Sequence, residues 1–200
     1  YGGFLYSCLQ DQDFKVRKIT LMVITHLVLN DMLKLKGEIC DIGLLLDDPV
    51  DKIRDLVKLF FQELNNKNGN IIYNLLPDAI SRLSNSKEYK DVITEEKFET
   101  LARNLMKYIE KDKQTESLVE KLCARIKNGK TEFERRNTVF CLSLLNYSEK
   151  AFRKLIENWD QYKERTTDKY TLEKFQNLIL KAKKSTKQDL RTMADDLEKK

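Results

Sequence analysis

The stretch Leu9–Arg17 reads LQDQDFKVR, and a second stretch, Leu46–Arg54, reads LDDPVDKIR. The shared leucine, aspartate and arginine lie at an offset of 37 residues, and the apolar positions that follow each arginine also correspond. This offset is close to that of stacked helical hairpins, because one such hairpin cannot bury its apolar face alone. We expect each aspartate to cap the second helix of its hairpin, and each arginine to bridge to a carboxylate of the next. The alternative is that these are ordinary cap and surface residues.

Helical periodicity extends along nearly the whole chain. Apolar residues recur at three- and four-residue spacings in the stripes Ile53–Leu64, Ile72–Leu83, Phe98–Ile109, Phe152–Trp159 and Leu172–Ala182. Each stripe needs a neighbouring helix to cover it, because an isolated amphipathic helix of this length is marginal in water. The 200 residues include only 6 Gly and 2 Pro, which disfavours a turn-rich β-sandwich or barrel. We therefore predict an all-α fold, a right-handed HEAT-repeat α-solenoid of about five antiparallel helical hairpins.

Local signals mark several helix ends. Thr131 and Glu134 form a capping box, in which the hydroxyl and the carboxylate satisfy free amides of the first turn. Thr94 precedes two glutamates, which suits the positive end of a helix. Asn68-Gly69 and Asn128-Gly129 predict left-handed backbone where helices close.

The segment Phe14–Asn30 is apolar on two sides. One side carries Val16, Ile19, Val23 and Leu27, and the other carries Leu21, Ile24 and Val28. A helix that is packed on both sides lies inside a stack, so we expect both apolar faces to be buried.

The sequence offers few residues for catalysis or metal binding. The four cysteines are widely spaced within apolar stretches and form no CxxC pair: Cys8, Cys40, Cys123 and Cys141. We expect buried, reduced thiols in an intracellular protein and no zinc site. The single histidine, His26, lies in an apolar run, where a packed residue is more common than a base. Because no Gly-rich phosphate loop occurs either, we expect no enzyme activity, no cofactor and no small-molecule substrate.

The charges are mixed along the chain. There are 37 Lys and Arg against 32 Asp and Glu, which gives a net charge of +5. A solvated helical exterior is expected, although the balance is compatible with nucleic-acid binding. No apolar run approaches the roughly 18 residues of a membrane span, and no signal peptide opens the chain. Since the chain does not begin with Met, we expect a fragment of a longer protein.

Three segments carry a resemblance to a known family. They are Leu21–Gly37 (LMVITHLVLNDMLKLKG), Asp112–Cys123 (DKQTESLVEKLC) and Cys141–Lys150 (CLSLLNYSEK). In this order they resemble the C-terminal HEAT region of the condensin complex subunit 1 family, the non-SMC HEAT-repeat subunits of condensin I. The likeness runs from about Asp13 to Lys183. It does not place the first dozen residues or the basic end from Ser185.

The resemblance implies a non-enzymatic regulatory scaffold in mitotic chromosome condensation. It implies association with the kleisin subunit and with the SMC ATPases that act on DNA, in the nucleus and on chromosomes, with a cytoplasmic pool. One segment corresponds to a Lys-Gly loop of the family that is expected to dock on an SMC ATPase head: Asn30, Asp31, Met32, Lys34, Lys36 and Gly37. Gly37 would let the backbone approach a partner closely. Without the family, the loop would be a connection whose lysines stay solvated.

We expect residues 1–184 to form a single solenoid segment, and residues 185–200 to form a charged tail that is a helical extension or is disordered. Basic residues cluster at three places that could contact DNA: Lys15, Arg17 and Lys18; Arg135 and Arg136; and Lys181, Lys183, Lys184 and Lys187. No base-reading motif accompanies them, so such contact would be sequence-independent and salt-sensitive. For the last cluster, a solvated tail is an equal alternative.

Three rival functions remain open. A sequence-independent DNA-binding HEAT module would rest on the net charge and on these basic clusters. A transport adaptor that recognises peptides would need a groove of exposed apolar residues. An enzyme ranks last, because its chemistry would have to depend on His26.

Overall fold

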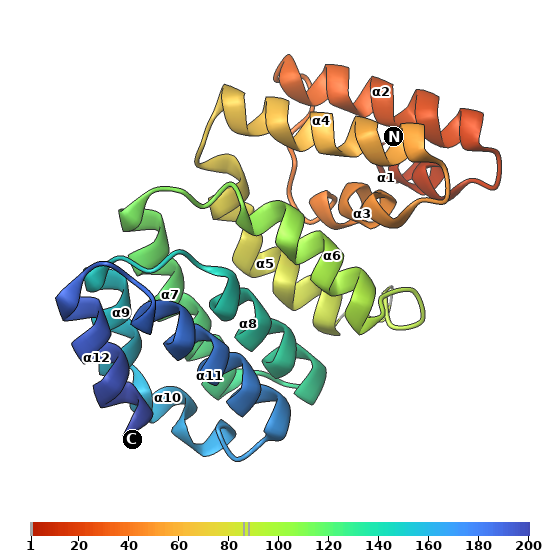
Figure 1. Cartoon of the computed structure of the whole chain (residues 1–200). Helices are drawn as coiled ribbons and strands as arrows, with labels where there is room; N and C mark the ends of the chain where they lie inside the picture. The colour runs from red at the N-terminus through yellow and green to blue at the C-terminus, as the bar shows by residue number, and fades with distance from the viewer. Residues whose placement is uncertain (1, 86, 88) are drawn as a thin grey trace. The chain divides into compact units, whose positions relative to one another are not determined.

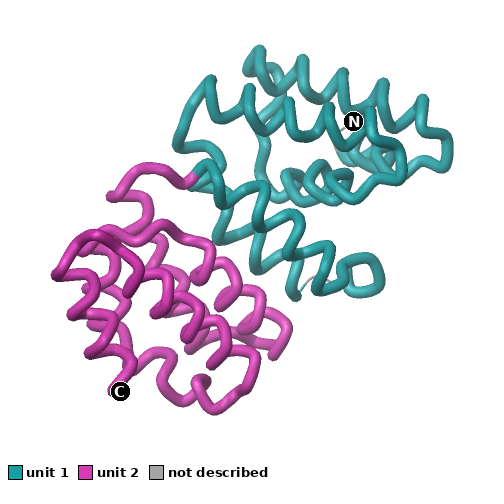
Figure 2. Tube along the Cα trace, in the orientation of Figure 1, with its two compact units in different colours: residues 1–108 teal, residues 109–200 magenta. Residues whose placement is uncertain are grey.

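The computed structural model of the chain describes residues 2–85, 87 and 89–200 (Figure 1). Over these residues the chain forms α-helices with short 3-10 segments, and no strand occurs among them. The all-α prediction is therefore confirmed. The chain divides into two compact units, residues 1–108 and residues 109–200 (Figure 2).

Unit 1 contains six α-helices among its described residues. They are α1 (Gly2–Ser7), α2 (Phe14–Leu29), α3 (Ile39–Leu44), α4 (Asp51–Lys67), α5 (Ile71–Asn85) and α6 (Glu95–Met106), with 3-10 turns at Cys8–Gln10 and Leu45–Asp47. Helix α2 packs on α4, and α3 packs on α5 and α6, as expected for stacked hairpins. The apolar stripe of α4 is buried almost completely, at Ile53, Val57, Phe60 and Leu64.

Unit 2 has the same kind of layering. Its helices are α7 (Asp112–Asn128), α8 (Glu132–Leu144), α9 (Glu149–Glu157), α10 (Trp159–Tyr162), α11 (Lys169–Lys183) and α12 (Gln188–Glu198), with a 3-10 turn at Lys163–Arg165. Helices α7, α9 and α12 pack in one row, and α8 packs on α11 in the other. The last helix buries Leu190, Ala194 and Leu197. The domain boundary expected at residue 184 stays a prediction, but the structure places a packed helix beyond it.

Two predicted helix starts are confirmed. The Thr94 hydroxyl accepts the Lys97 N–H at 3.2 Å, and the Thr131 hydroxyl accepts the Glu134 N–H at 3.0 Å. The Glu134 carboxylate completes the capping box one residue earlier than expected, because it accepts the N–H of Lys130 at 2.8 Å.

The predicted left-handed closures are wrong. Asn68 has an extended backbone with φ −157°, and Gly129 has φ −57°. Among the described residues, the only positive φ belongs to Asp31, at 58°. Aspartate tolerates this conformation better than most residues do, and here it follows the end of α2.

The prediction that α2 is covered on both sides is also wrong. Leu21, Ile24 and Val28 are buried, whereas Ile19 and Val23 on the opposite face are 62% and 42% exposed. Within unit 1 the partner helix α4 covers only one side of α2. Helix α2 therefore presents an apolar stripe at the surface.

Candidate functional site

A buried ion pair joins the first two hairpins. The Arg17 guanidinium donates to both carboxylate oxygens of Asp48, from Nε at 2.8 Å and from Nη2 at 3.1 Å. The side chains of Arg17 and Asp48 are only 11% and 3% exposed. Hydrogen bonding to Asp48 raises the pKa of Arg17 further above its ordinary value, so the guanidinium stays charged. The predicted bridge to the next hairpin is confirmed for Arg17 and is wrong for Arg54, which pairs with Asp51 of its own helix.

The repeat aspartates act differently from the prediction. The carboxylate of Asp11 accepts the N–H of Asp13 at 2.8 Å, and that of Asp48 accepts the N–H of Val50 at 2.8 Å. These are turns that precede the helix. The cap of α2 is Asp13, which accepts the N–H of Lys15 at 2.8 Å, and Val50 at the start of α4 supplies no side-chain cap.

The same arginine contact occurs in both units. Nη1 of Arg17 donates to the carbonyl of Asp11 at 2.8 Å, and Nη1 of Arg54 donates to the carbonyl of Asp48. In unit 2, Nη1 of Arg135 donates to the carbonyl of Gly129 at 2.8 Å. Each contact spans six residues of sequence. The third copy escaped the sequence comparison because Gly129 stands where the other copies have aspartate, and the carbonyl needs no particular side chain.

The Lys-Gly loop, residues 30–37, begins with backbone fixed to the helices beside it. The Lys67 ammonium, at the end of α4, donates to the carbonyl of Leu29 at 2.8 Å and to the Asp31 carboxylate at 2.6 Å. The N–H groups of Met32 and Leu33 donate to the carbonyl of Leu27, at 2.8 and 3.1 Å. A cation at a helix C-terminus also stabilises its negative end. The loop therefore starts from a defined position.

Beyond this anchor, the loop presents its side chains to solvent. Met32 is 68% exposed, and Asn30, Asp31, Lys34 and Lys36 are exposed as well. The ammonium groups of Lys34 and Lys36 have no ion-pair partner among the described residues. The loop thus offers one apolar side chain and two unneutralised cations.

Gly37, at the end of the loop, lies close to a side chain of α5 in the same unit. A Cβ atom added at Gly37 would overlap the guanidinium of Arg82 on α5. The close approach that this glycine permits is therefore to Arg82, a contact that sequence reasoning did not foresee. Because the Arg82 side chain is flexible, the packing requirement at Gly37 is mild.

Four residues of the predicted basic clusters form ion pairs within their own unit. Arg17 is buried with Asp48, Arg136 pairs with Asp168 at 2.9 Å, and Lys183 pairs with Asp195 at 2.9 Å. Arg135 pairs with Glu132 at 2.8 Å. The remaining cations have no ion-pair partner among the described residues: Lys15, Lys18, Lys181, Lys184 and Lys187.

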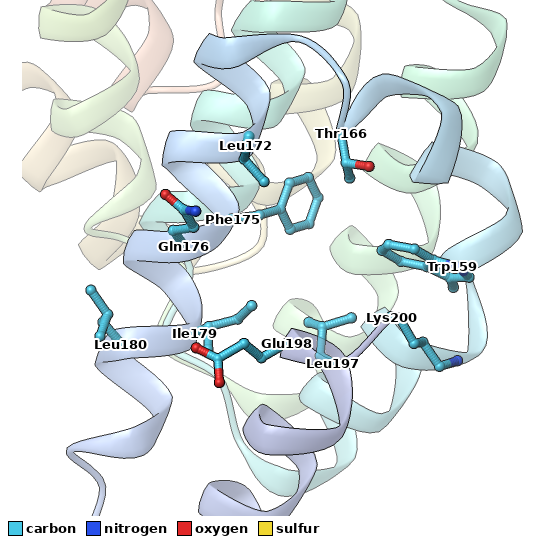
Figure 3. Close-up of a pocket in the computed structure, with 10 residues that line it drawn as sticks. All are labelled: Trp159, Thr166, Leu172, Phe175, Gln176, Ile179, Leu180, Leu197, Glu198 and Lys200. Carbon is cyan, nitrogen blue, oxygen red and sulfur yellow. The ribbon is translucent and has the colours of Figure 1, made fainter.

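An apolar pocket of about 420 Å³ opens in unit 2 (Figure 3). Trp159 of α10, Phe175 and Ile179 of α11, and Leu197 of α12 line it, and Lys200 lies at its edge. These walls suit an apolar group. The lining also includes two charged side chains, Glu198 and Lys200, near the end of the chain.

The environments of the cysteines and of the single histidine differ. Burial raises the pKa of the Cys123 thiol to about 12 and also raises that of Cys141, so both are protonated and inert at neutral pH. Cys40 is buried, and Cys8 is half-buried. The prediction that His26 is packed is wrong, because the residue is exposed near the end of α2, 3.3 Å from the Asn30 amide nitrogen.

Among the described residues, no group of three or more histidine, cysteine, aspartate or glutamate side chains is placed to hold a metal ion. No helix there is long and apolar enough to cross a membrane.

Comparison with known proteins gives consistent matches. The sequence model of Cnd1, the non-SMC mitotic condensation complex subunit 1, matches residues 1–143. Condensin complex subunit 1 of Xenopus laevis is 43% identical over 196 residues, and that of Homo sapiens is 42% identical over 196 residues. Condensin-1 complex subunit CAP-D2 of Arabidopsis thaliana is 40% identical over 197 residues. Each alignment covers 98% of this chain but only 14% of the relative, so the chain spans a small part of their length.

Proposed function

This chain belongs to the family of non-SMC mitotic condensation complex subunit 1, and from that membership we propose that it serves as a non-enzymatic HEAT-repeat scaffold of condensin. In this role it associates with the kleisin subunit and docks on an SMC ATPase head, in mitotic chromosome condensation. It works in the nucleus and on chromosomes, with a cytoplasmic pool. It needs no cofactor.

The exposed Lys-Gly loop carries this proposal. Lys67 fixes its first residues, so little conformational entropy is lost when a partner binds. Met32 supplies an apolar anchor, while Lys34 and Lys36 supply charges that steer an acidic partner surface. An SMC head with a complementary acidic patch would therefore bind at this loop.

The test is the affinity of the full chain for an isolated SMC ATPase head, measured by titration calorimetry. The variant Lys34→Glu/Lys36→Glu should bind roughly tenfold more weakly or worse, because it reverses both unneutralised charges. The matched control is Lys87→Glu/Lys90→Glu, which makes the same charge change on another exposed segment of unit 1. Equal affinity of the loop variant and the control would remove the loop from the mechanism.

A second candidate function is sequence-independent DNA binding. Lys181, Lys184 and Lys187 are exposed around the end of α11 and have no ion-pair partner among the described residues. Such lysines release counterions from a phosphate backbone, so the affinity should fall steeply with salt. Titration with duplex DNA at two salt concentrations tests this function, and absence of binding at the lower concentration disposes of it.

A further inference from the structure

An apolar groove lies between the parallel helices α2 and α4 in unit 1. Its volume is about 310 Å³, and its lining includes Leu21, Met22, His26, Leu56, Leu59 and Phe60. Met22 and Leu59 on its two walls are 52% and 50% exposed. Large apolar side chains scattered singly on a surface are normal, but here they line one depression.

The apolar surface extends beyond the groove along α2. Phe14, Ile19 and Val23 are all exposed on this helix, in addition to Met22. Of these four residues only Met22 lines the groove, where it faces Leu59 of α4, whereas Ile19 and Val23 lie on the side of α2 opposite Leu21. A groove with apolar walls on two parallel helices matches the apolar face of a further helix, which is recognised through side chains at three- and four-residue spacings.

The groove is basic at one end. Lys18 and Lys15 precede Met22 by four and seven residues, and Lys52 precedes Leu59 by seven. These spacings place the lysines on the groove-facing side of α2 and α4, at the helix N-termini. All three lack an ion-pair partner among the described residues, whereas the nearby Asp51 and Asp55 are paired with Arg54 and Lys58 of their own helix. The positive ends of the two helix dipoles add to the charge there.

The opposite end of the groove carries no such group of lysines among the described residues. There the lining passes to Leu29 and Asn30, and the exposed Glu63 follows Leu59 by four residues on α4. The groove therefore has a polarity, with unpaired cations at one end only. An occupant bound in a single direction would carry its negative charge over Lys15, Lys18 and Lys52.

We propose that the α2–α4 groove binds an amphipathic helix of a partner protein, whose apolar stripe ends in acidic residues. The apolar stripe covers Met22 and Leu59, and the acidic turn lies over the three lysines. A nucleic acid fits less well, because phosphates would pair with Lys15 and Lys18 but leave Met22 and Leu59 exposed. This inference is independent of the proposed contact between the Lys-Gly loop and an SMC head.

The probe is a fluorescein-labelled helical peptide with leucines at three- and four-residue spacings and glutamates in one terminal turn. Fluorescence anisotropy with the full chain should give saturable binding. Met22→Glu/Leu59→Glu should weaken it about tenfold or more, because two carboxylates would enter the apolar contact. The matched control, Leu172→Glu/Leu180→Glu, alters two leucines of unit 2 that are 42% and 52% exposed, and it should bind like the unaltered chain.

The charged end is tested separately. Lys15→Glu/Lys18→Glu should weaken binding severalfold and reduce its salt dependence, and a peptide with lysines in place of the glutamates should recover affinity for this variant. Lys34→Glu/Lys36→Glu should leave peptide binding unchanged, which separates this groove from the Lys-Gly loop. Circular dichroism should confirm that every variant is folded.

Two results would overturn the proposal. One is peptide binding that Met22→Glu/Leu59→Glu does not weaken. The other is duplex DNA binding that is lost in Lys15→Glu/Lys18→Glu while the acidic peptide binds no better than the lysine peptide. In that case the lysines serve a nucleic acid.

Discussion

Among the described residues of each unit, an arginine–aspartate pair joins consecutive hairpins, but the pair in unit 1 and the pair in unit 2 differ in burial. Arg17 and Asp48 in unit 1 are 11% and 3% exposed, whereas Arg136 and Asp168 in unit 2 are 39% and 27% exposed. The shortest distances are nearly equal, at 2.8 and 2.9 Å. Similar geometry therefore does not imply similar energetics. A buried charge that loses its partner is costly, whereas water screens an exposed one.

The largest expected effect is the loss of Asp48. Asp48→Ala would leave the buried Arg17 guanidinium uncompensated, so we expect it to lower the free energy of unfolding by about 3–5 kcal/mol. The N–H of Val50 would lose its acceptor as well. Chemical denaturation followed by circular dichroism measures this loss.

The control for this prediction removes both charges together. In Arg17→Met/Asp48→Leu no buried charge is left unpaired, so most of the lost stability should return. If Asp48→Ala alone costs less than about 1 kcal/mol, the pair in unit 1 behaves like a surface pair and the contrast with unit 2 disappears.

A smaller effect is expected at Asp168. This residue caps α11, and its carboxylate accepts both the N–H and the hydroxyl of Thr171 at 3.0 Å. Asp168→Ala should cost about 1–2 kcal/mol, mostly through the lost cap. Asp168→Asn can keep the cap while removing the charge and should cost under about 1 kcal/mol. Equal losses in the two variants would mean that the ion pair, and not the cap, dominates at this site.

The acid stability of unit 2 follows from the same carboxylate. The N–H of Thr171, followed by Arg136, holds the pKa of Asp168 below its ordinary value. A carboxyl whose pKa is lowered on folding stabilises the folded state above its unfolded pKa, and this stabilisation is lost as the pH falls through the folded pKa. The stability difference between the unaltered chain and Asp168→Asn should therefore shrink below about pH 4. Denaturation at pH 2.5, 3.5 and 6 tests this, and a pH-independent difference would contradict it.

The sequence was sufficient for the features that depend on neighbouring residues. Apolar spacing predicted the buried stripe of α4, and the threonines at 94 and 131 were predicted as helix starts. The repeat even predicted that Arg17 reaches a carboxylate of the next hairpin, because the same residues recur at the same offset. Patterns of this kind are set by the helical period and by the length of one hairpin.

Features that depend on what covers a surface were not predictable. Ile19 and Val23 have the spacing of core residues, yet no helix of unit 1 covers them, since periodicity identifies an apolar face and not its neighbour. The anchor of the Lys-Gly loop is equally non-local, because Lys67 lies 36 residues after Asp31. Both the exposure of Ile19 and Val23 and the contact of Lys67 with Asp31 depend on where α4 packs against α2, which is a matter of tertiary structure.

The smallest expected effect is a difference in how salt changes the coupling energies of the two ion pairs. Double-mutant cycles for Arg17 with Asp48, and for Arg136 with Asp168, give a coupling energy for each pair. At 1 M NaCl the Debye length is about 3 Å, so the coupling in unit 2, at most about 1 kcal/mol, should fall towards zero. The coupling in unit 1 should persist, because ions do not reach a pair whose carboxylate is 3% exposed. If salt weakened both couplings equally, water would have access to both pairs, and burial would not explain the larger cost expected for Asp48→Ala.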